Sequence, residues 1–252
     1  MFKQFLLAIV LGASAGVASA QQWGDLDGTF VYKGTPPAPM KITPEKDPEY
    51  CGKHPLVVEN LVVNKENGGM ANVVIYLFTA QGAKVEVHPD YAKTAKDEVR
   101  VDNHNCRFEP HVQGIRTGQT LVVGNKDPIA HNTKGEFFAN NPFNDLIPAN
   151  NDIKKTFMTA ETTPSELSCS IHPWMKAYLL IRDNPYFAVS DKDGKFSIKN
   201  LPAGEHTFIV WSNKYITDVA IAGKPTTWTR GRPKFTIKSG PNALGKIEVV
   251  VK

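Results

Sequence analysis

The chain has 252 residues, of which 41% are hydrophobic and 21% charged, and its formal net charge at pH 7 is +4. This charge is small and spread over scattered lysines, which excludes a nucleic-acid-binding protein because such proteins need a basic stripe. The sequence has no His-Glu-x-x-His motif and no phosphate-cradling glycine loop, so we do not expect an enzyme.

Residues 1–20 have the pattern of a secretory signal. Lys3 supplies the positive start, an apolar run covers residues 5–17, and Ala18-Ser19-Ala20 fits a cleavage site. The apolar run is too short for a comfortable membrane span. We therefore expect an exported, periplasmic bacterial protein that begins at residue 21, with no stable membrane insertion. Removal of Lys3 would lower the formal net charge to +3.

Beyond residue 20, the apolar segments are short, β-branched or alternating, and Gly, Pro, Asn and Asp turns separate them. This pattern predicts an all-β protein. One short helical turn is expected at residues 91–96. The expected strands cover residues 28–32, 73–78, 98–102, 121–124, 177–182, 187–190, 195–198, 206–211 and 246–251.

The three cysteines of an exported chain allow one pair and leave one residue over. Cys169 belongs to the motif described next, so Cys51 and Cys106 are the expected disulfide. An oxidising compartment favours this bond. The alternative is two separate free thiols.

The segment Cys169-Ser-Ile-His172-Pro-Trp-Met175 places a thiol, an imidazole and a thioether in one short loop, and His131 lies 38 residues upstream of Cys169. Two imidazoles and one cysteine, with a weak axial methionine, form the ligand set of a blue-copper site. The alternative is that Cys169 and Met175 are ordinary core residues. We expect one copper ion per chain, as Cu(I) or Cu(II), bound by His131, Cys169, His172 and Met175.

The residues around these ligands resemble the cupredoxin family. The resemblance rests on Phe108-Glu-Pro110, Gly118-Gln-Thr-Leu-Val-Val, Asn125 and His131-Asn132, and on Cys-x2-His-Pro-aromatic-Met, which is similar to the contracted ligand loop of amicyanin-like members. It covers residues 97–183 approximately and departs from the family at Thr133-Lys-Gly and over residues 137–151.

The resemblance implies a Greek-key β-sandwich in which Asn132 and Ser170 order the ligand loops. It also implies that the ring edge of His172 reaches the surface inside an apolar collar of Pro173 and Trp174, where a partner would dock. His111 enters the same end of the domain. Four roles for His111 stay open: an extra metal ligand, a hydrogen-bond donor to one of the ligands, a residue of the docking surface, or a partly exposed strand residue without a role in the site.

The C-terminal third has a strand–turn–strand pattern with turns at Asp193-Gly194 and Pro202-Ala-Gly204. Together with the early strands at residues 28–32 and 72–77, it resembles a transthyretin-like β-sandwich of the carboxypeptidase-regulatory type. We expect residues 21–82 and 184–252 to form this host domain, with a cupredoxin domain inserted at residues 83–183. Two tandem domains are the alternative.

The ligand set predicts a periplasmic type 1 copper protein that carries single electrons between redox partners, such as a dehydrogenase or cytochrome c. One alternative is a copper chaperone or storage protein, for which we would expect more Met or Cys ligands. The other is a structural or adhesion β-sandwich module with a vestigial copper site.

Overall fold

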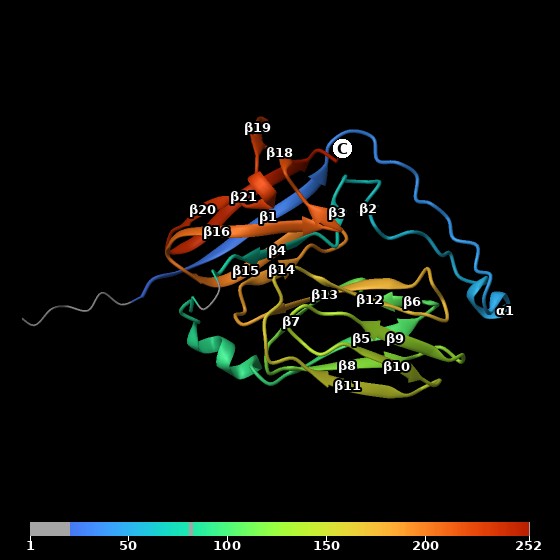
Figure 1. Ribbon diagram of the computed structural model, residues 1–252. Helices are drawn as coiled ribbons and strands as arrows, with labels where there is room; N and C mark the ends of the chain where they lie inside the picture. The colour runs from blue at the N-terminus through green and yellow to red at the C-terminus, as the bar shows by residue number, and fades with distance from the viewer. Residues whose placement is uncertain (1–20, 81–82, 252) are drawn as a thin grey trace, which may run out of the picture.

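The computed structural model describes residues 21–80 and 83–251 (Figure 1). The predicted signal segment, residues 1–20, lies outside the described residues. Nearly all regular structure is strand, which confirms the predicted all-β class. The helical segments are α1 (Pro48–Cys51), η1 (Pro89–Thr94) and η2 (Thr229–Gly231). Within residues 21–80 and 83–251, no helix is both long enough and apolar enough to span a bilayer.

One β-sandwich is built from both ends of the chain and forms the upper half of Figure 1. Its strands are β1 (Trp23–Tyr32), β4 (Val74–Leu77), β14 (Phe187–Val189), β15 (Lys195–Pro202), β16 (Gly204–Ser212), β17 (Lys214–Tyr215), β18 (Asp218–Ile221), β19 (Lys224–Thr227), β20 (Lys234–Ile237) and β21 (Gly240–Val249). β1 lies between β15 and β21, and β4 lies between β14 and β16. Strands from the two ends therefore share both sheets.

The chain between these strands forms a second β-sandwich, in the lower half of Figure 1. Its strands are β5 (Glu98–His104), β6 (Arg107–Glu109), β7 (Val112–Arg116), β8 (Thr120–Asn125), β9 (His131–Gly135), β10 (Phe143–Ile147), β11 (Asp152–Thr156), β12 (Ser165–Ser168) and β13 (Lys176–Arg182). One sheet has the order β10-β9-β12-β13-β7 and the other β11-β8-β5-β6. The domain boundaries and the transthyretin-like assignment of the first sandwich stay predictions.

The two sandwiches pack against each other through strands that are buried on both faces. On β4, Ile75 and Leu77 face the core of the first sandwich, whereas Val74 and Tyr76 pack in a separate cluster with Leu180 of β13. Successive side chains of a strand point to opposite faces, so a strand between two apolar layers reads as an unbroken apolar run. This explains the apolar sequence of residues 73–78.

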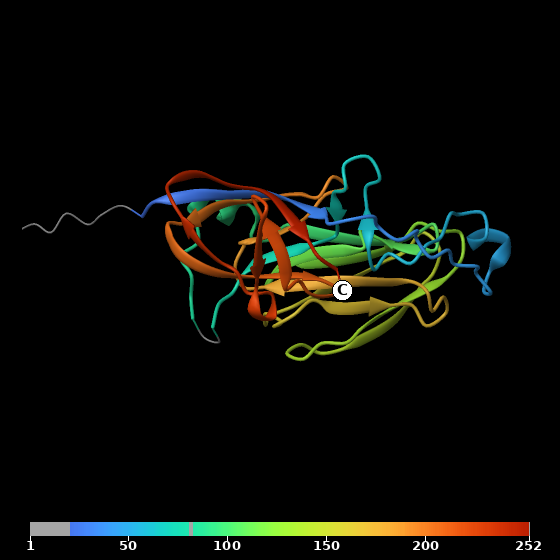
Figure 2. The same cartoon turned by 90° about the horizontal axis from the view of Figure 1, so that it is seen from above.

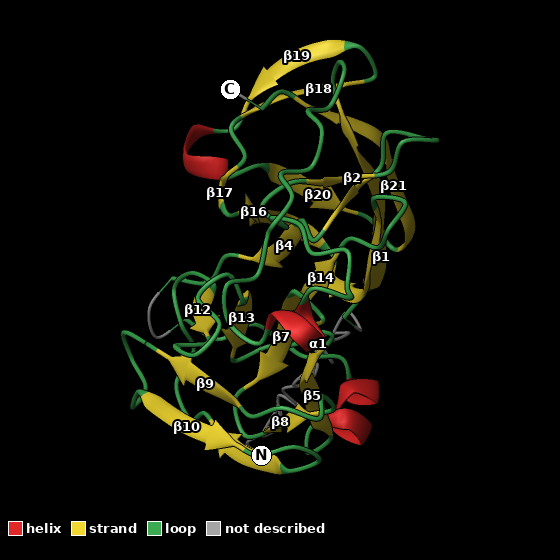
Figure 3. Ribbon diagram, turned by 90° about the vertical axis from the view of Figure 1, so that its right-hand side faces the viewer, coloured by secondary structure: helices red, strands yellow, loops and turns green. Residues whose placement is uncertain are grey.

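Between β1 and the short hairpin of β2 (Val62–Val63) and β3 (Met70–Ala71), the chain forms a long arm, which we call the strap (residues 40–58). Its two limbs are joined where Ile42 N donates to Leu56 O at 3.0 Å and Val58 N donates to Met40 O at 2.9 Å. The tip is α1, which lies at the far end of the lower sandwich (Figures 1 and 2). Seen from that end, α1 lies in front of the lower strands (Figure 3).

A disulfide fixes the tip of the strap to the second sandwich. Cys51 of α1 is bonded to Cys106, which lies in the turn between β5 and β6, and their Cα atoms are 5.5 Å apart. This confirms the predicted pairing and leaves Cys169 as the free thiol. The strap is therefore held at one end of the β5–β13 sandwich, where the predicted metal ligands also lie.

Candidate metal centre

The four predicted ligands come from two segments at one end of the second sandwich. His131 is the first residue of β9, and Cys169 directly follows β12. The loop from Cys169 to Met175 is closed by its own backbone, since Met175 N donates to His172 O at 2.9 Å and Cys169 N donates to Met175 O at 3.2 Å. All four side chains are buried, with at most 2% of their surface exposed.

Three of the predicted ligands meet as a compact group. Cys169 Sγ and one nitrogen from each of His131 and His172 all lie within 4.8 Å of one another. The Nδ1 atom of His172 is 3.8 Å from Cys169 Sγ. The Nδ1 atom of His131 is buried and has no hydrogen-bond partner. A buried nitrogen without a partner beside a thiol and a second imidazole fits a metal ion with nitrogen and sulfur ligands. Met175 shares the core cluster of Cys169.

The surroundings of Cys169 favour its metal-binding form. Burial by itself would raise the pKa of the Cys169 thiol, but the adjacent imidazoles of His131 and His172, together with backbone amides, lower it to about 6. Among these amides, His172 N lies 3.4 Å from Cys169 Sγ. The thiolate is the form of cysteine that binds metals.

A buried carboxylate holds the outer nitrogen of His131. His131 Nε2 donates to Asp127 Oδ2 at 2.8 Å, and both side chains are fully buried. Asp127 also accepts hydrogen bonds from the backbone amides of Asn105 and Cys106 and from the hydroxyl of Tyr50. Burial would raise the pKa of Asp127, but these hydrogen bonds, with His131 first, lower it to about 2. Asp127 therefore stays ionised and fixes the ring of His131.

A second carboxylate holds the outer nitrogen of His172. His172 Nε2 donates to Oδ2 of Asp47, on the strap, at 2.8 Å. The His172 side chain is 0% exposed, whereas the Asp47 side chain is 43% exposed. The expectation that the ring edge of His172 reaches the surface is therefore wrong, because the strap covers it. Both imidazoles thus engage a carboxylate through Nε2, which leaves Nδ1 to face the thiol.

Asn132 ties the two ligand-bearing segments together. Its Oδ1 accepts hydrogen bonds from the amides of Ser170 and Ile171, at 2.7 and 3.2 Å, and from Cys169 Sγ at 3.3 Å. Its Nδ2 lies 3.4 Å from the Ser170 hydroxyl. The neighbour of His131 on β9 therefore holds the first turn of the cysteine loop in place.

Trp174 and His111 lie beside the centre. The ring of Trp174 meets the His172 ring edge-on, with centroids 5.3 Å apart, and its indole N–H donates to Cys106 O at 3.0 Å. His111 Nδ1 is 3.0 Å from Lys176 O. Among the described residues, His111 does not belong to a group that brings three ligand atoms together.

The sequence reasoning missed Asp47 and Asp127. Asp127 lies four residues before His131, and its spacing gives a local signal. Asp47 is 125 residues from His172, so no local spacing connects them. The indirect signal was its place four residues before Cys51, because the predicted disulfide brings this segment to the turn at Cys106.

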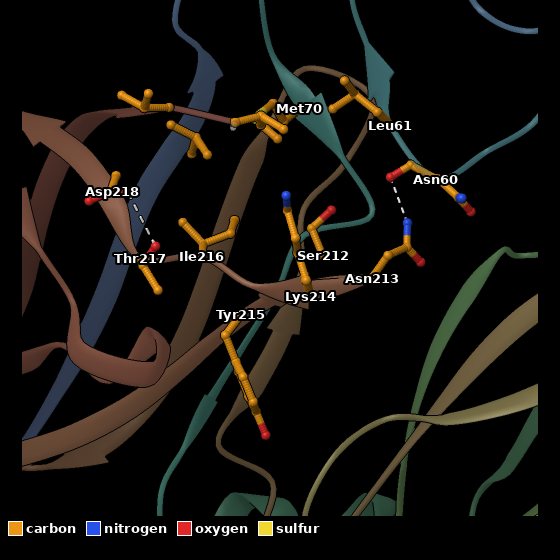
Figure 4. Close-up of a pocket in the computed structure, with 13 residues that line it drawn as sticks. Asn60, Leu61, Met70, Ser212, Asn213, Lys214, Tyr215, Ile216, Thr217 and Asp218 are labelled. Carbon is orange, nitrogen blue, oxygen red and sulfur yellow. Dashed lines mark hydrogen bonds between the residues drawn. The ribbon is translucent and has the colours of Figure 1, made fainter.

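A separate pocket of about 400 Å³ lies in the first sandwich (Figure 4). It is bordered by the segment from Ser212 to Asp218, by Asn60 and Leu61, and by Met70. Asn213 Nδ2 donates to Asn60 O at 2.6 Å across one side. Its lining contains none of the predicted metal ligands, so the two sites are distinct.

Comparison with known proteins gives matches to solved structures only. No family model matches the chain, and no curated protein matches it. A copper-containing nitrite reductase from Thermus scotoductus aligns at 21% identity over 42% of this chain, with a TM-score of 0.31, but the match spans only 25% of the reductase chain. A reduced amicyanin variant aligns at 18% identity over 36% of this chain and 88% of its own, with a TM-score of 0.31.

A purple cupredoxin from Nitrosopumilus maritimus aligns at 19% identity over 34% of this chain and 99% of its own, with a TM-score of 0.29. These identities and TM-scores are low. Any function of the centre must therefore be argued from the chain's own residues.

Proposed function

We propose that the protein is a periplasmic type 1 copper protein that carries single electrons between redox partners. The observation that supports this most strongly is the buried group of His131, Cys169 and His172, in which a nitrogen of each ring and the thiol sulfur converge. Two imidazoles and one thiolate are the equatorial ligands of such a site. Met175, buried at the end of the same loop, is the proposed weak axial ligand.

A bound copper ion would supply a one-electron couple and an intense thiolate-to-copper absorption band. The residues of the chain supply a rigid frame for it. Asp127 and Asp47 fix the two rings, and Asn132 fixes the start of the cysteine loop. A frame that holds one geometry in both oxidation states needs little rearrangement, which suits electron transfer better than transfer of the ion itself.

The enclosure of the centre also distinguishes the proposal from a copper chaperone. A chaperone must exchange ligands with its partner, and that requires access to at least one of its own. Here the side chains of His131 and His172 are 0% exposed and that of Cys169 is 2% exposed. The proposed partner is a redox protein, such as a dehydrogenase or a cytochrome c, and the first sandwich is the proposed transthyretin-like host that carries the centre.

The test is copper binding by the purified protein and by its Cys169→Ser variant. The wild type should bind one copper per chain and show an intense visible absorption band when oxidised, because Cys169 is the free thiol. The variant should lose this band, since a serine hydroxyl does not replace the thiolate. Metal analysis and visible spectroscopy measure both results.

A Ser170→Ala variant is the matched control, because Ser170 is the exposed neighbour of Cys169 and its side chain faces Asn132 rather than the ligands. It should keep the band. An intense band that survives in Cys169→Ser would contradict the assignment. A colourless wild type that binds Cu(I) tightly would favour a chaperone or storage role, and a wild type that binds no copper would favour a structural module.

A further inference from the structure

One helical turn of the strap contacts His172 directly and His131 through Asp127. Asp47, at the N-terminal end of α1, accepts the hydrogen bond of His172 Nε2. One turn later, the Tyr50 hydroxyl donates to Asp127 Oδ1 at 2.9 Å, and Asp127 in turn holds His131. Cys51 then joins this turn to the second sandwich through the disulfide. Three neighbouring positions of the strap therefore act on the same centre.

The backbone at Asp47 is unusual for its position. It has φ 47° and ψ 46°, in the left-handed region, although it is not a glycine and is followed by Pro48. A residue before proline normally adopts an extended conformation, and left-handed backbone is costly for most side chains. Asp47 also occupies the N-cap of α1, where aspartate usually accepts a hydrogen bond from a helix amide, but its side chain makes no such bond. The carboxylate instead points to His172.

We propose that Asp47 is a positioning residue for the metal ligand His172, and that the disulfide-anchored strap is the fixed cover of the centre. This inference rests on the proposed copper-binding function. Asp47 would hold the proton of His172 on Nε2, so that Nδ1 is free for the metal, and would keep the ring from rotating. Hydrogen-bond partners behind a metal-binding histidine act in this way in other metal sites.

Two consequences separate this role from simple packing. The carboxylate places a negative charge next to a ligand, and this charge stabilises Cu(II) relative to Cu(I) because Cu(II) carries the larger positive charge. It also fixes the tautomer of His172 before any metal arrives. The first consequence is read from the reduction potential, and the second from the copper-free protein.

The experiment compares the wild type with Asp47→Ala, Asp47→Asn and Glu49→Gln in the full chain. Glu49→Gln is the matched control, because it also removes a negative charge from α1 but Glu49 is exposed. Copper affinity is measured by competition with a chelator, and the reduction potential by redox titration. The ring nitrogens of His172 are observed in the copper-free protein by long-range proton–nitrogen NMR.

Asp47→Ala should lower the copper affinity by about 10–100-fold and raise the reduction potential, while keeping the visible band. Asp47→Asn should raise the reduction potential as well but retain more of the affinity, because its amide oxygen still accepts from His172. In copper-free wild type, His172 should carry its proton on Nε2, and Asp47→Ala should populate both tautomers. Glu49→Gln should match the wild type in every measurement.

The outcomes separate this inference from the proposed function. If the wild type binds copper but Asp47→Ala matches Glu49→Gln in affinity and potential, the positioning role is wrong and the copper proposal stands. A copper-free wild type in which His172 carries its proton on Nδ1 also overturns the positioning role. If the wild type binds no copper, the proposed function falls, and this inference with it.

Discussion

Asn132 shows how one side chain organises the proposed copper loop. It is 6% exposed, and its Oδ1 accepts from two consecutive amides, those of Ser170 and Ile171, and from the thiol of Cys169. Two amide donors that point to one acceptor hold the loop in a single conformation. Without that acceptor, the donors would face a partly buried space with no partner.

Asn132→Ala should therefore lower the free energy of unfolding of the copper-free protein by about 1–3 kcal/mol. Urea unfolding monitored by circular dichroism measures this change. The control is Asn151→Ala, at an exposed position whose Nδ2 donates to Ala149 O at 3.0 Å and does not touch the cysteine loop, and its effect should stay within about 0.5 kcal/mol. Equal losses in the two variants would mean that Asn132 does not organise the loop.

The sequence predicted the residues whose type is typical of a metal ligand. It missed the aspartates that hydrogen-bond to those ligands in the folded protein. His131, Cys169 and His172 were recognisable because few residue types bind copper, and the structure brings them together. Asp47 and Asp127 were not recognised. Aspartates are common, so the four-residue spacing of Asp127 from His131 is a weak signal, and only the fold brings Asp47 to His172. The exposure of His172 was mispredicted for the same reason, since the strap that covers it comes from 125 residues away.

The strands β5, β8 and β11 are joined by a guanidinium that crosses the middle strand. Arg100 of β5 makes two hydrogen bonds to the carboxylate of Asp152 on β11, at 2.7 and 2.9 Å, and one to Asp102 at 2.7 Å. It passes over Gly124 of β8, where a Cβ atom would lie 2.1 Å from Arg100 Nη2. Glycine at position 124 leaves room for this ion pair, because a side chain there would push the ends of Arg100, Asp102 and Asp152 aside.

This ion pair makes the free energy of unfolding depend on pH, with a contribution that is lost in acid. The hydrogen bond from Arg100 holds the pKa of Asp152 below its ordinary value of 3.8. The folded state then binds the proton of Asp152 more weakly than the unfolded state. The stabilisation is therefore present above pH 3.8 and is lost as the pH falls through the lower pKa of the folded state.

Asp152→Asn should accordingly lower the free energy of unfolding at pH 7 by at most about 1 kcal/mol, because the pair is partly exposed and screened by solvent. This loss of stability should become smaller as the pH falls below the ordinary pKa of the Asp152 carboxyl, 3.8. Urea unfolding at several pH values measures it. Glu98→Gln, which removes the exposed pair with Lys154, is the control for a general charge effect. A deficit that grows towards acid pH would contradict the assignment.

Strand prediction succeeded for the strands that are buried on both faces. It missed several other strands, both at the edges of sheets and, for β9, β12 and β18, inside them. The strands β4 and β13 lie between two apolar layers, and their residues were correctly predicted from apolar runs. The strands β11 and β19 were missed. β11 lies at the edge of its sheet with alternating exposed residues, and β19 at an edge with every residue exposed. Edge strands carry polar side chains, which also protect the edge from pairing with other chains.

The middle of the molecule is a layer shared by the two sandwiches. Tyr178 of β13 meets Trp211 of β16 edge-on, with ring centroids 4.8 Å apart. Val74 and Tyr76 of β4 and Leu180 of β13 complete the apolar cluster between the sandwiches. Because β4 and β16 also supply one sheet of the first sandwich, loss of that sandwich would expose the outer face of β13.

A chain of residues 21–183 should therefore fail to fold as a unit. It retains β1 and β4 but lacks β15 and β21, between which β1 lies, and β14 and β16, between which β4 lies. It also lacks Trp211, so Tyr178 loses its contact across the interface. We expect the 21–183 chain to show a weak or absent thermal transition by circular dichroism and to aggregate through its unpaired strands.

The chain of residues 21–252 is the control and should unfold in one cooperative transition. If the 21–183 chain melted as sharply and at the same temperature as the control, the two sandwiches would be energetically independent, and the strand pairings between the chain ends would not be needed to hold the proposed copper centre.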